Sequence, residues 1–121
     1  MNDIDIDSDA LRQGLAWGAI GFGAVAAAAP RVFTSVYGLA DSGELRVMTR
    51  LWGSRTAALG LVLLGAEGEE SRRLSRLAVG MNLADALVIA GAGPDVHRRS
   101  RVLGSLTSAA FAAAYGVLLS N

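Results

Sequence analysis

A chain of 121 residues is the size of one domain, and its 52% hydrophobic and 18% charged residues compare with roughly 25% charged residues in a soluble domain. The formal net charge of zero argues against nucleic acid as a partner, and the lack of cysteine excludes disulfides, thiolate nucleophiles and thiolate metal sites. With a single histidine in the sequence, we expect neither a metal nor a cofactor.

The first apolar stretch runs from Gln13 to Pro30 and contains no ionisable side chain. Ser8 precedes it and is a residue type that caps helices, so we predict a helix over about residues 10–29. The segment from Pro30 to Gly43 follows this helix. We expect it to be a loop, either a plain connector or a lid over one end of the fold.

Three further helices are predicted along the chain. The second covers about residues 44–66, and its length of about 34 Å suffices to cross a bilayer. The third covers about residues 71–91, from Ser71 to the breaker that starts at Gly91 and includes Pro94. The fourth covers about residues 100–119, and it is uncharged from Val102 to Ser120. Each of these helices is followed or preceded by a short polar connection.

These lengths predict an all-α fold, an integral membrane four-helix bundle in up-down-up-down order that forms one transmembrane domain over residues 1–121. A soluble bundle is the alternative, but the first and fourth helices lack a polar face. All 11 basic residues are arginine, a bias typical of GC-rich bacterial genomes, so we expect a multi-pass protein of a bacterial cell membrane. Small residues recur at a spacing of four, which favours close helix contacts: Gly14 and Gly18, Ala19 and Gly23, Gly104 and Ser108, Ala112 and Gly116.

Two of the predicted spans carry polar side chains at depth, where such groups are costly and normally face a partner. Arg50 and Arg55 lie on the second helix, and Asn82 and Asp85 share one face of the third. In two antiparallel helices, residues that are equally far from the connecting turn lie at the same depth. By this count Asn82 lies level with Arg55. Asp85 lies level with Arg50 and within diagonal reach of Arg55. The two arginines differ by about 140° in direction, so we expect only one of them to pair directly.

Two hypotheses explain this polar cluster. In the first, two arginines and one carboxylate leave about one uncompensated positive charge, which favours binding of a polar group of a lipophilic small molecule. The protein is then a membrane isomerase or cyclase that uses acid–base chemistry, with Asp85, Arg55 and Arg50 as catalytic residues and Asn82, Trp52 and Trp17 as substrate-binding residues. In the second, the charges are structural and the protein is a non-catalytic membrane partner or accessory subunit. Membrane lipids surround the protein in both, and a homo-oligomer or a membrane protein partner is compatible with either.

Three features form a wider pattern: Pro30 followed by Tyr37-Gly38, the stretch Arg50-Leu51-Trp52-Gly53-Ser54-Arg55 with Leu59-Gly60 beyond it, and the pair Asn82 and Asp85. In this pattern and in length, the sequence resembles the small four-helix bacterial membrane proteins of the DoxX-like superfamily. The resemblance implies a helical membrane bundle whose relatives are associated with quinone-linked or thiol-linked oxidation. A thiol-linked role does not carry over to a chain without cysteine.

Overall fold

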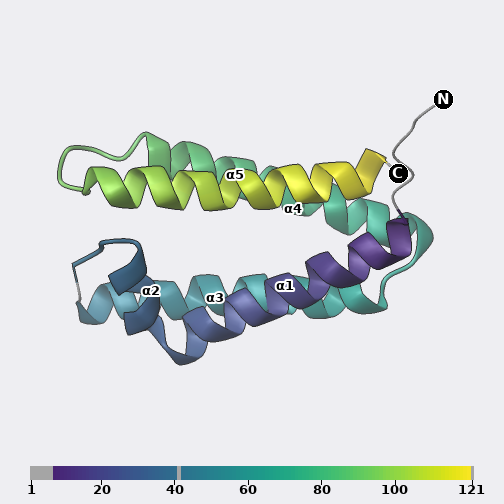
Figure 1. The fold of residues 1–121 in the computed structure, drawn as a ribbon, viewed down its shortest axis with the longest axis horizontal. Helices are drawn as coiled ribbons and strands as arrows, with labels where there is room; N and C mark the ends of the chain where they lie inside the picture. The colour runs from purple at the N-terminus through teal and green to yellow at the C-terminus, as the bar shows by residue number, and fades with distance from the viewer. Residues whose placement is uncertain (1–6, 41, 121) are drawn as a thin grey trace.

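The computed structural model describes residues 7–40 and 42–120, and these form five helices and no strand. The prediction of an all-α fold is therefore confirmed. The helices are α1 (Ser8–Ala28), α2 (Pro30–Val36), α3 (Gly43–Gly65), α4 (Gly68–Ala90) and α5 (Arg98–Ser120). The long helices α1, α3, α4 and α5 occupy the places of the four predicted helices, and each runs in the direction opposite to the one before it (Figure 1).

The segment expected to be a loop contains the short helix α2. Pro30 is its first residue, where the fixed φ of proline fits a helix and its missing N–H is not needed. The chain turns by 103° between α1 and α2. Proline after an apolar helix therefore marked the start of a new helix as well as the end of the old one.

Helix α4 begins at Gly68, earlier than the start predicted at Ser71. Glu69 and Glu70, which lie between the two predicted helices 44–66 and 71–91, belong to the first turn of α4. Carboxylates at this position are stabilised by the partial positive charge of a helix N-terminus. The acidic residues between α3 and α4 therefore belong to the helix, and Gly68 with φ of 57° supplies the tight connection.

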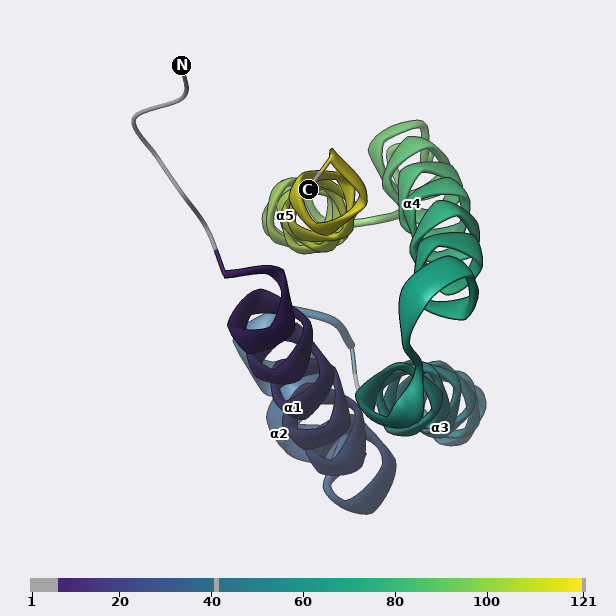
Figure 2. The same ribbon diagram turned by 90° about the vertical axis from the view of Figure 1, so that its right-hand side faces the viewer.

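The long helices pack as two hairpins. Helix α1 lies along α3, and α4 lies along α5, whereas contacts between α3 and α4 and between α1 and α5 are sparse. Figure 2 looks along the helices and shows the α1–α3 pair facing the α4–α5 pair. The α3–α4 boundary, where we expected the polar cluster, is therefore a loosely packed seam.

Glycines bring α1 and α3 into backbone contact. Gly23, Gly53 and Gly60 are all buried, and a Cβ atom on Gly53 would lie 2.5 Å from the carbonyl oxygen of Gly23 and 2.7 Å from the amide nitrogen of Ala27. Of the small-residue pairs noted in the sequence, Ala19 and Gly23 are buried at this contact. Gly14 and Gly18, in contrast, are exposed with open space around them.

The α4–α5 hairpin also packs through small residues. Gly104, Ser108 and Ala112 of α5 are buried, while Gly116 is half-buried. A Cβ atom on Gly104 would lie 3.1 Å from Cγ2 of Ile89 on α4. Each hairpin is thus held by a narrow stripe of small side chains, so its larger apolar side chains are left for the outer faces.

The outer faces of the helices are strongly apolar. Leu87, for example, is 75% exposed, and large exposed apolar side chains occur on all five helices: Trp17, Val25, Val32, Val36, Val47, Met48, Leu51, Leu61, Val62, Leu77, Leu83, Leu87, Val88, Val102, Leu106 and Val117. Among the described residues, one helix, Arg98–Ser120, is long and apolar enough to cross a membrane, or two if the bent α1–α2 pair counts as one span. A surface of this kind is unusual for a soluble monomer.

Helix α2 ties the two hairpins together at one end. The Tyr37 hydroxyl lies 2.6 Å from Oγ1 of Thr107 on α5, and Ser100 at the start of α5 donates a hydrogen bond of 2.7 Å to the carbonyl oxygen of Tyr37. Gly38 follows with φ of 72°, a conformation that glycine adopts readily. The segment that we expected to be a connector or a lid is therefore anchored to the neighbouring hairpin.

Candidate functional site

An ion pair crosses the seam between α3 and α4. Nη2 of Arg55 lies 2.5 Å from Oδ2 of Asp85. The side chains are 42% and 25% exposed, respectively. Side chains on a helix point back toward its N-terminus, so Arg55 extends toward the level of α4 at which Asp85 lies. Asp85 was predicted to lie within diagonal reach of Arg55, and in the structure these two residues form the pair.

Arg50 lies outside this pair. It is exposed, and it makes no ion pair or hydrogen bond with any residue in the described ranges 7–40 and 42–120. Arg50 and Asp85 were predicted to lie at the same depth, but they do not contact each other. The reason is that the side chains of Arg50 and Arg55 leave α3 in directions about 140° apart. The structure thus brings one of the two predicted catalytic arginines to the carboxylate and leaves the other on the outer surface.

Asn82 is buried on the inner face of α4. Its Nδ2 atom donates a hydrogen bond of 2.8 Å to the carbonyl oxygen of Ala78, one turn earlier. This bond fixes the amide, and its oxygen receives no hydrogen bond from the described part of the chain. Asn82 and Arg55 line the same small cavity, as their predicted common depth implied.

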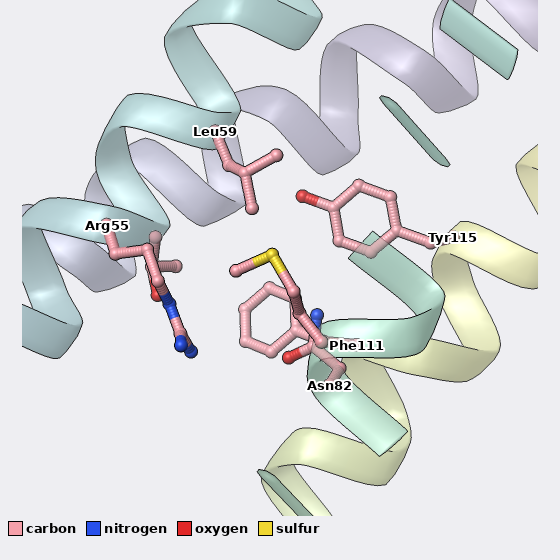
Figure 3. A pocket seen from close by; sticks show the side chains of 7 residues that line it. Arg55, Leu59, Asn82, Phe111 and Tyr115 are labelled. Atoms are coloured by element: carbon pink, nitrogen blue, oxygen red, sulfur yellow. The ribbon is translucent and has the colours of Figure 1, made fainter. Parts of the chain in front are cut away.

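That cavity has a volume of about 10 Å³ and lies between the two hairpins. Figure 3 shows Arg55 and Leu59 of α3 on one side, and Asn82 of α4 with Phe111 and Tyr115 of α5 on the other. The full lining consists of Arg55, Thr56, Leu59, Met81, Asn82, Phe111 and Tyr115. The inward polar groups therefore come from three helices, and α5 contributes to a site that we predicted without it.

Tyr115 and Thr56 are the polar residues that the sequence analysis missed. Tyr115 is only 2% exposed, and its ring packs in the central apolar cluster with residues of α1, α3 and α4. Thr56 follows Arg55 directly and lines the same cavity. The sequence contained one indication that Tyr115 belongs to a polar site. It is a tyrosine within a largely apolar predicted span, and a buried phenol hydroxyl usually has a polar partner.

The two tryptophans lie away from the cavity. The Trp52 ring is 5.6 Å from the rings of both Phe22 and Phe33, edge-on to the first. Phe22 in turn lies 5.5 Å from Phe111, which lines the cavity. Trp17 is 59% exposed on the outer face of α1. Trp52 therefore supports the site through Phe22, and Trp17 does not contribute to it.

Arg12 has a structural role that the sequence analysis did not identify. It is buried, and its Nη1 atom donates hydrogen bonds to the carbonyl oxygens of Leu63 at 3.0 Å and Leu64 at 2.6 Å. Its Nη2 atom pairs with Asp9 at 2.5 Å. The last carbonyls of a helix lack partners within the helix, so Arg12 of α1 caps the end of α3.

A second, open hollow of about 330 Å³ adjoins this cap at the end of the fold that holds the α3–α4 turn. It is lined by Asp9, Arg12, Glu67, Gly68, Ser71, Arg72 and Leu118. The charged side chains in this lining are both acidic and basic: Asp9, Glu67, Arg12 and Arg72.

Within the described ranges, no group of three or more His, Cys, Asp or Glu side chains is placed to hold a metal ion.

The chain matches no known protein family, no curated protein and no solved structure in sequence or fold comparison.

Proposed function

We propose that this is a multi-pass protein of a bacterial cell membrane in which α1, α3, α4 and α5 form a four-helix up-down bundle. The apolar outer faces support this, because in water they would form an extended exposed patch. The lengths support it as well: each of these helices has 21 or 23 residues, close to the ~20 needed to cross a bilayer. In lipid the same side chains lie in a favourable environment.

We infer further that the seam between α3 and α4 binds the polar group of a lipophilic small molecule. The observation that carries this inference is the Arg55–Asp85 pair, which is partly exposed between two helices with apolar outer faces and whose Arg55 lines the small cavity beside Asn82. Charged groups within a bilayer are costly and mark functional sites. The sparse contacts between α3 and α4 would let a molecule reach the pair sideways from the lipid.

If the site catalyses a reaction, the residues present favour acid–base isomerisation or cyclisation. Asp85 would take a proton from one atom of the substrate and return it to another, so that no co-reactant is needed. Arg55 would donate hydrogen bonds to an oxygen that gains negative charge. Arg50 is exposed and forms no bond with the pair among the described residues, so we do not include it in this role.

A non-catalytic accessory subunit is the second candidate function. The observation that favours it is the exposed face of α1, where Gly14 and Gly18 have no atom within 4 Å of the Cβ position. Small residues at this spacing commonly seat a partner helix in membranes. In this case the Arg55–Asp85 pair would be structural. The likeness to DoxX-like proteins is a hypothesis compatible with both candidates.

Two measurements test the proposal in sequence. Membranes from expressing cells are washed at alkaline pH, and the protein should stay in the pellet; release into the wash would contradict membrane integration. The detergent-purified protein is then analysed by native mass spectrometry for small molecules that co-purify with it. We expect a bound molecule on the wild type and on the control Arg50→Gln, and its loss from Asp85→Asn and Arg55→Gln. Equal retention by all four proteins would contradict binding at the pair.

A further inference from the structure

Three arginines lie at the start of α5 without an acidic partner. Arg98, Arg99 and Arg101 belong to its first two turns, and their guanidinium groups form no ion pair or hydrogen bond with any residue that the structure describes. Asp95 is the one aspartate or glutamate in the sequence from Gly91 onward, and it forms no ion pair within the described ranges either. The start of α5 therefore carries positive charge that its neighbours do not neutralise.

The position of these arginines on the helix adds to the positive charge. The N-terminus of a helix carries a partial positive charge, which opposes cations and favours anions. The first turn of α5 contains no acidic residue. The first amides of a helix also lack acceptors within the helix, and together with the guanidinium groups they offer an anion several hydrogen-bond donors.

Arg101 provides a separate indication of a polar partner. Its side chain is half-buried, and its Nε atom is the one buried side-chain nitrogen or oxygen in the described part of the chain that has no hydrogen-bond partner. Buried polar atoms are nearly always hydrogen-bonded, and a missing bond costs most for a charged group. The side chain of Arg101 therefore favours a strong acceptor at this end of α5.

Helix α2 and the residues that follow it hold the start of α5 in place. Ser100 donates a hydrogen bond of 2.7 Å to the carbonyl oxygen of Tyr37. Arg99 packs over Gly38, where an added Cβ atom would lie 3.0 Å from Cδ of the arginine. Figure 1 shows α2 and the start of α5 at the same end of the fold. The arginines are thus presented by a fixed helix end, which lowers the entropic cost of binding.

The surface next to the arginines is apolar. Arg98, Val102 and Leu106 follow one another at a spacing of four and so share one face of α5. Arg98 is exposed, and Val102 and Leu106 are 45% and 60% exposed. Helix α5 is also long and apolar enough to cross a membrane. Cationic groups at the end of such an apolar face match a phospholipid, whose phosphate group is joined to acyl chains, better than a free phosphate ion.

We propose that the start of α5 binds the phosphate group of an anionic phospholipid. Arg98, Arg99 and Arg101 donate hydrogen bonds to the phosphate oxygens, which a guanidinium group can contact in pairs. Val102 and Leu106 lie beside an acyl chain. A lipid with net negative charge is favoured over a zwitterionic one, because the quaternary ammonium of phosphatidylcholine brings a further positive charge to a site that is already positive.

The test uses three probes: dioleoylphosphatidylglycerol, dioleoylphosphatidylcholine and inorganic phosphate. Each is added to the full-length protein after purification and delipidation in detergent, and binding is followed by native mass spectrometry and by the change in thermal midpoint. We expect phosphatidylglycerol to bind more tightly than phosphatidylcholine and to raise the midpoint, and inorganic phosphate at the same concentration to leave the midpoint unchanged. The preference for phosphatidylglycerol should decrease as salt is added, because salt screens exposed charges.

Replacing the three arginines should remove this preference. In the triple variant Arg98→Gln, Arg99→Gln, Arg101→Gln, we expect phosphatidylglycerol binding to weaken by roughly fivefold for each arginine removed, and phosphatidylcholine binding to stay the same. If the triple variant folds poorly because Arg101 is half-buried, the double variant Arg98→Gln, Arg99→Gln replaces only exposed side chains. It should weaken phosphatidylglycerol binding in the same direction.

The start of α4 offers a matched control with the same change in charge. Arg72, Arg73 and Arg76 also lie in the first turns of a long helix, but Glu69 and Glu70 share that segment, and Arg76 lies 3.6 Å from Glu69. Replacing these three arginines by glutamine should leave the preference for phosphatidylglycerol unchanged. An equal loss in this control would show a general effect of net charge and would overturn the inference.

The remaining outcomes separate this inference from the proposed function, on whose membrane placement it rests. Equal binding of the two lipids would overturn the inference. A rise in midpoint with inorganic phosphate as large as with phosphatidylglycerol would also overturn it, in favour of a free anion. Release of the protein in the alkaline wash would contradict both. If the protein stays in the membrane and a molecule co-purifies with it through Arg55 and Asp85, only the inference about α5 fails.

Discussion

Arg55 on α3 reaches Asp85 on α4 across the seam between the two hairpins, with Nη2 2.5 Å from Oδ2. The two helices otherwise contact each other little, so this pair is a main link between them along their length. Arg55 of this pair also lines the cavity to which Asn82 and Tyr115 contribute. The strength and the accessibility of the pair are therefore the properties to measure first.

A double-mutant cycle should detect the energy of this pair. We expect Arg55→Gln and Asp85→Asn each to lower the free energy of unfolding, and the double variant to lose less than the sum. The coupling should be about 0.5–1 kcal/mol in detergent, because both side chains are partly exposed. Additive losses would show that the contact contributes nothing; the same cycle with Arg50→Gln in place of Arg55→Gln serves as the control.

Replacing Gly53 or Gly18 by alanine should change the free energy of unfolding in opposite directions. Gly53→Ala places a Cβ atom against the backbone of α1 and should destabilise the protein by about 1–3 kcal/mol, the usual result of overpacking. Gly18→Ala has open space and should stabilise α1 by up to about 1 kcal/mol through helix propensity. Unfolding in detergent followed by circular dichroism measures both. Equal effects would contradict the α1–α3 contact.

Removing the Arg12 cap should weaken the end of α3. Arg12→Met keeps much of the side-chain volume but loses the bonds to the Leu63 and Leu64 carbonyls. We expect a loss of about 1.5–3 kcal/mol, the range for buried hydrogen bonds of charged groups. Arg72→Met is the control in the same hollow, because Arg72 is exposed. If both variants melt alike, Arg12 has no special role.

The attachment of α2 to α5 can be followed by hydrogen exchange. Tyr37→Phe removes the hydrogen bond to Thr107, and the amides of α2 should then exchange faster, with a local loss of about 0.5–1.5 kcal/mol. The amides of α4 should be unaffected and provide the internal control. Unchanged exchange in α2 would indicate that the Ser100 contact alone holds the segment.

The sequence contained enough information for the long helices and for placing Asp85 within reach of Arg55, but it left open which of the two arginines, Arg50 or Arg55, pairs with Asp85. Apolar length and helical register are local properties, and each can be counted along the chain. The cap formed by Arg12, the hydroxyl of Tyr115 in the cavity and the docking of α2 on α5 are different. Each depends on contacts between distant residues, such as Arg12 with Leu63, that no spacing within one helix reveals.

The same reasoning explains why the sequence did not reveal that Trp17 lies on the outer face of α1. The sequence places it among small residues of a span, and such a helix offers no polar face to show which side is outward. The burial of Ala16 and Ala19 turns Trp17 outward. The buried side of α1 is therefore set by the alanines and glycines that contact α3.

The central claim is that Arg55 and Asp85 form a binding site for a lipophilic molecule within the membrane. The most direct test compares the thermal midpoints of the wild type, Asp85→Asn and Arg55→Gln in detergent, with and without lipophilic metabolites extracted from the host. We predict that both variants fold with midpoints near that of the wild type, and that only the wild type is stabilised by the extract. Collapse of either variant, together with no shift of the wild type, would show that the charges are structural and contradict the claim.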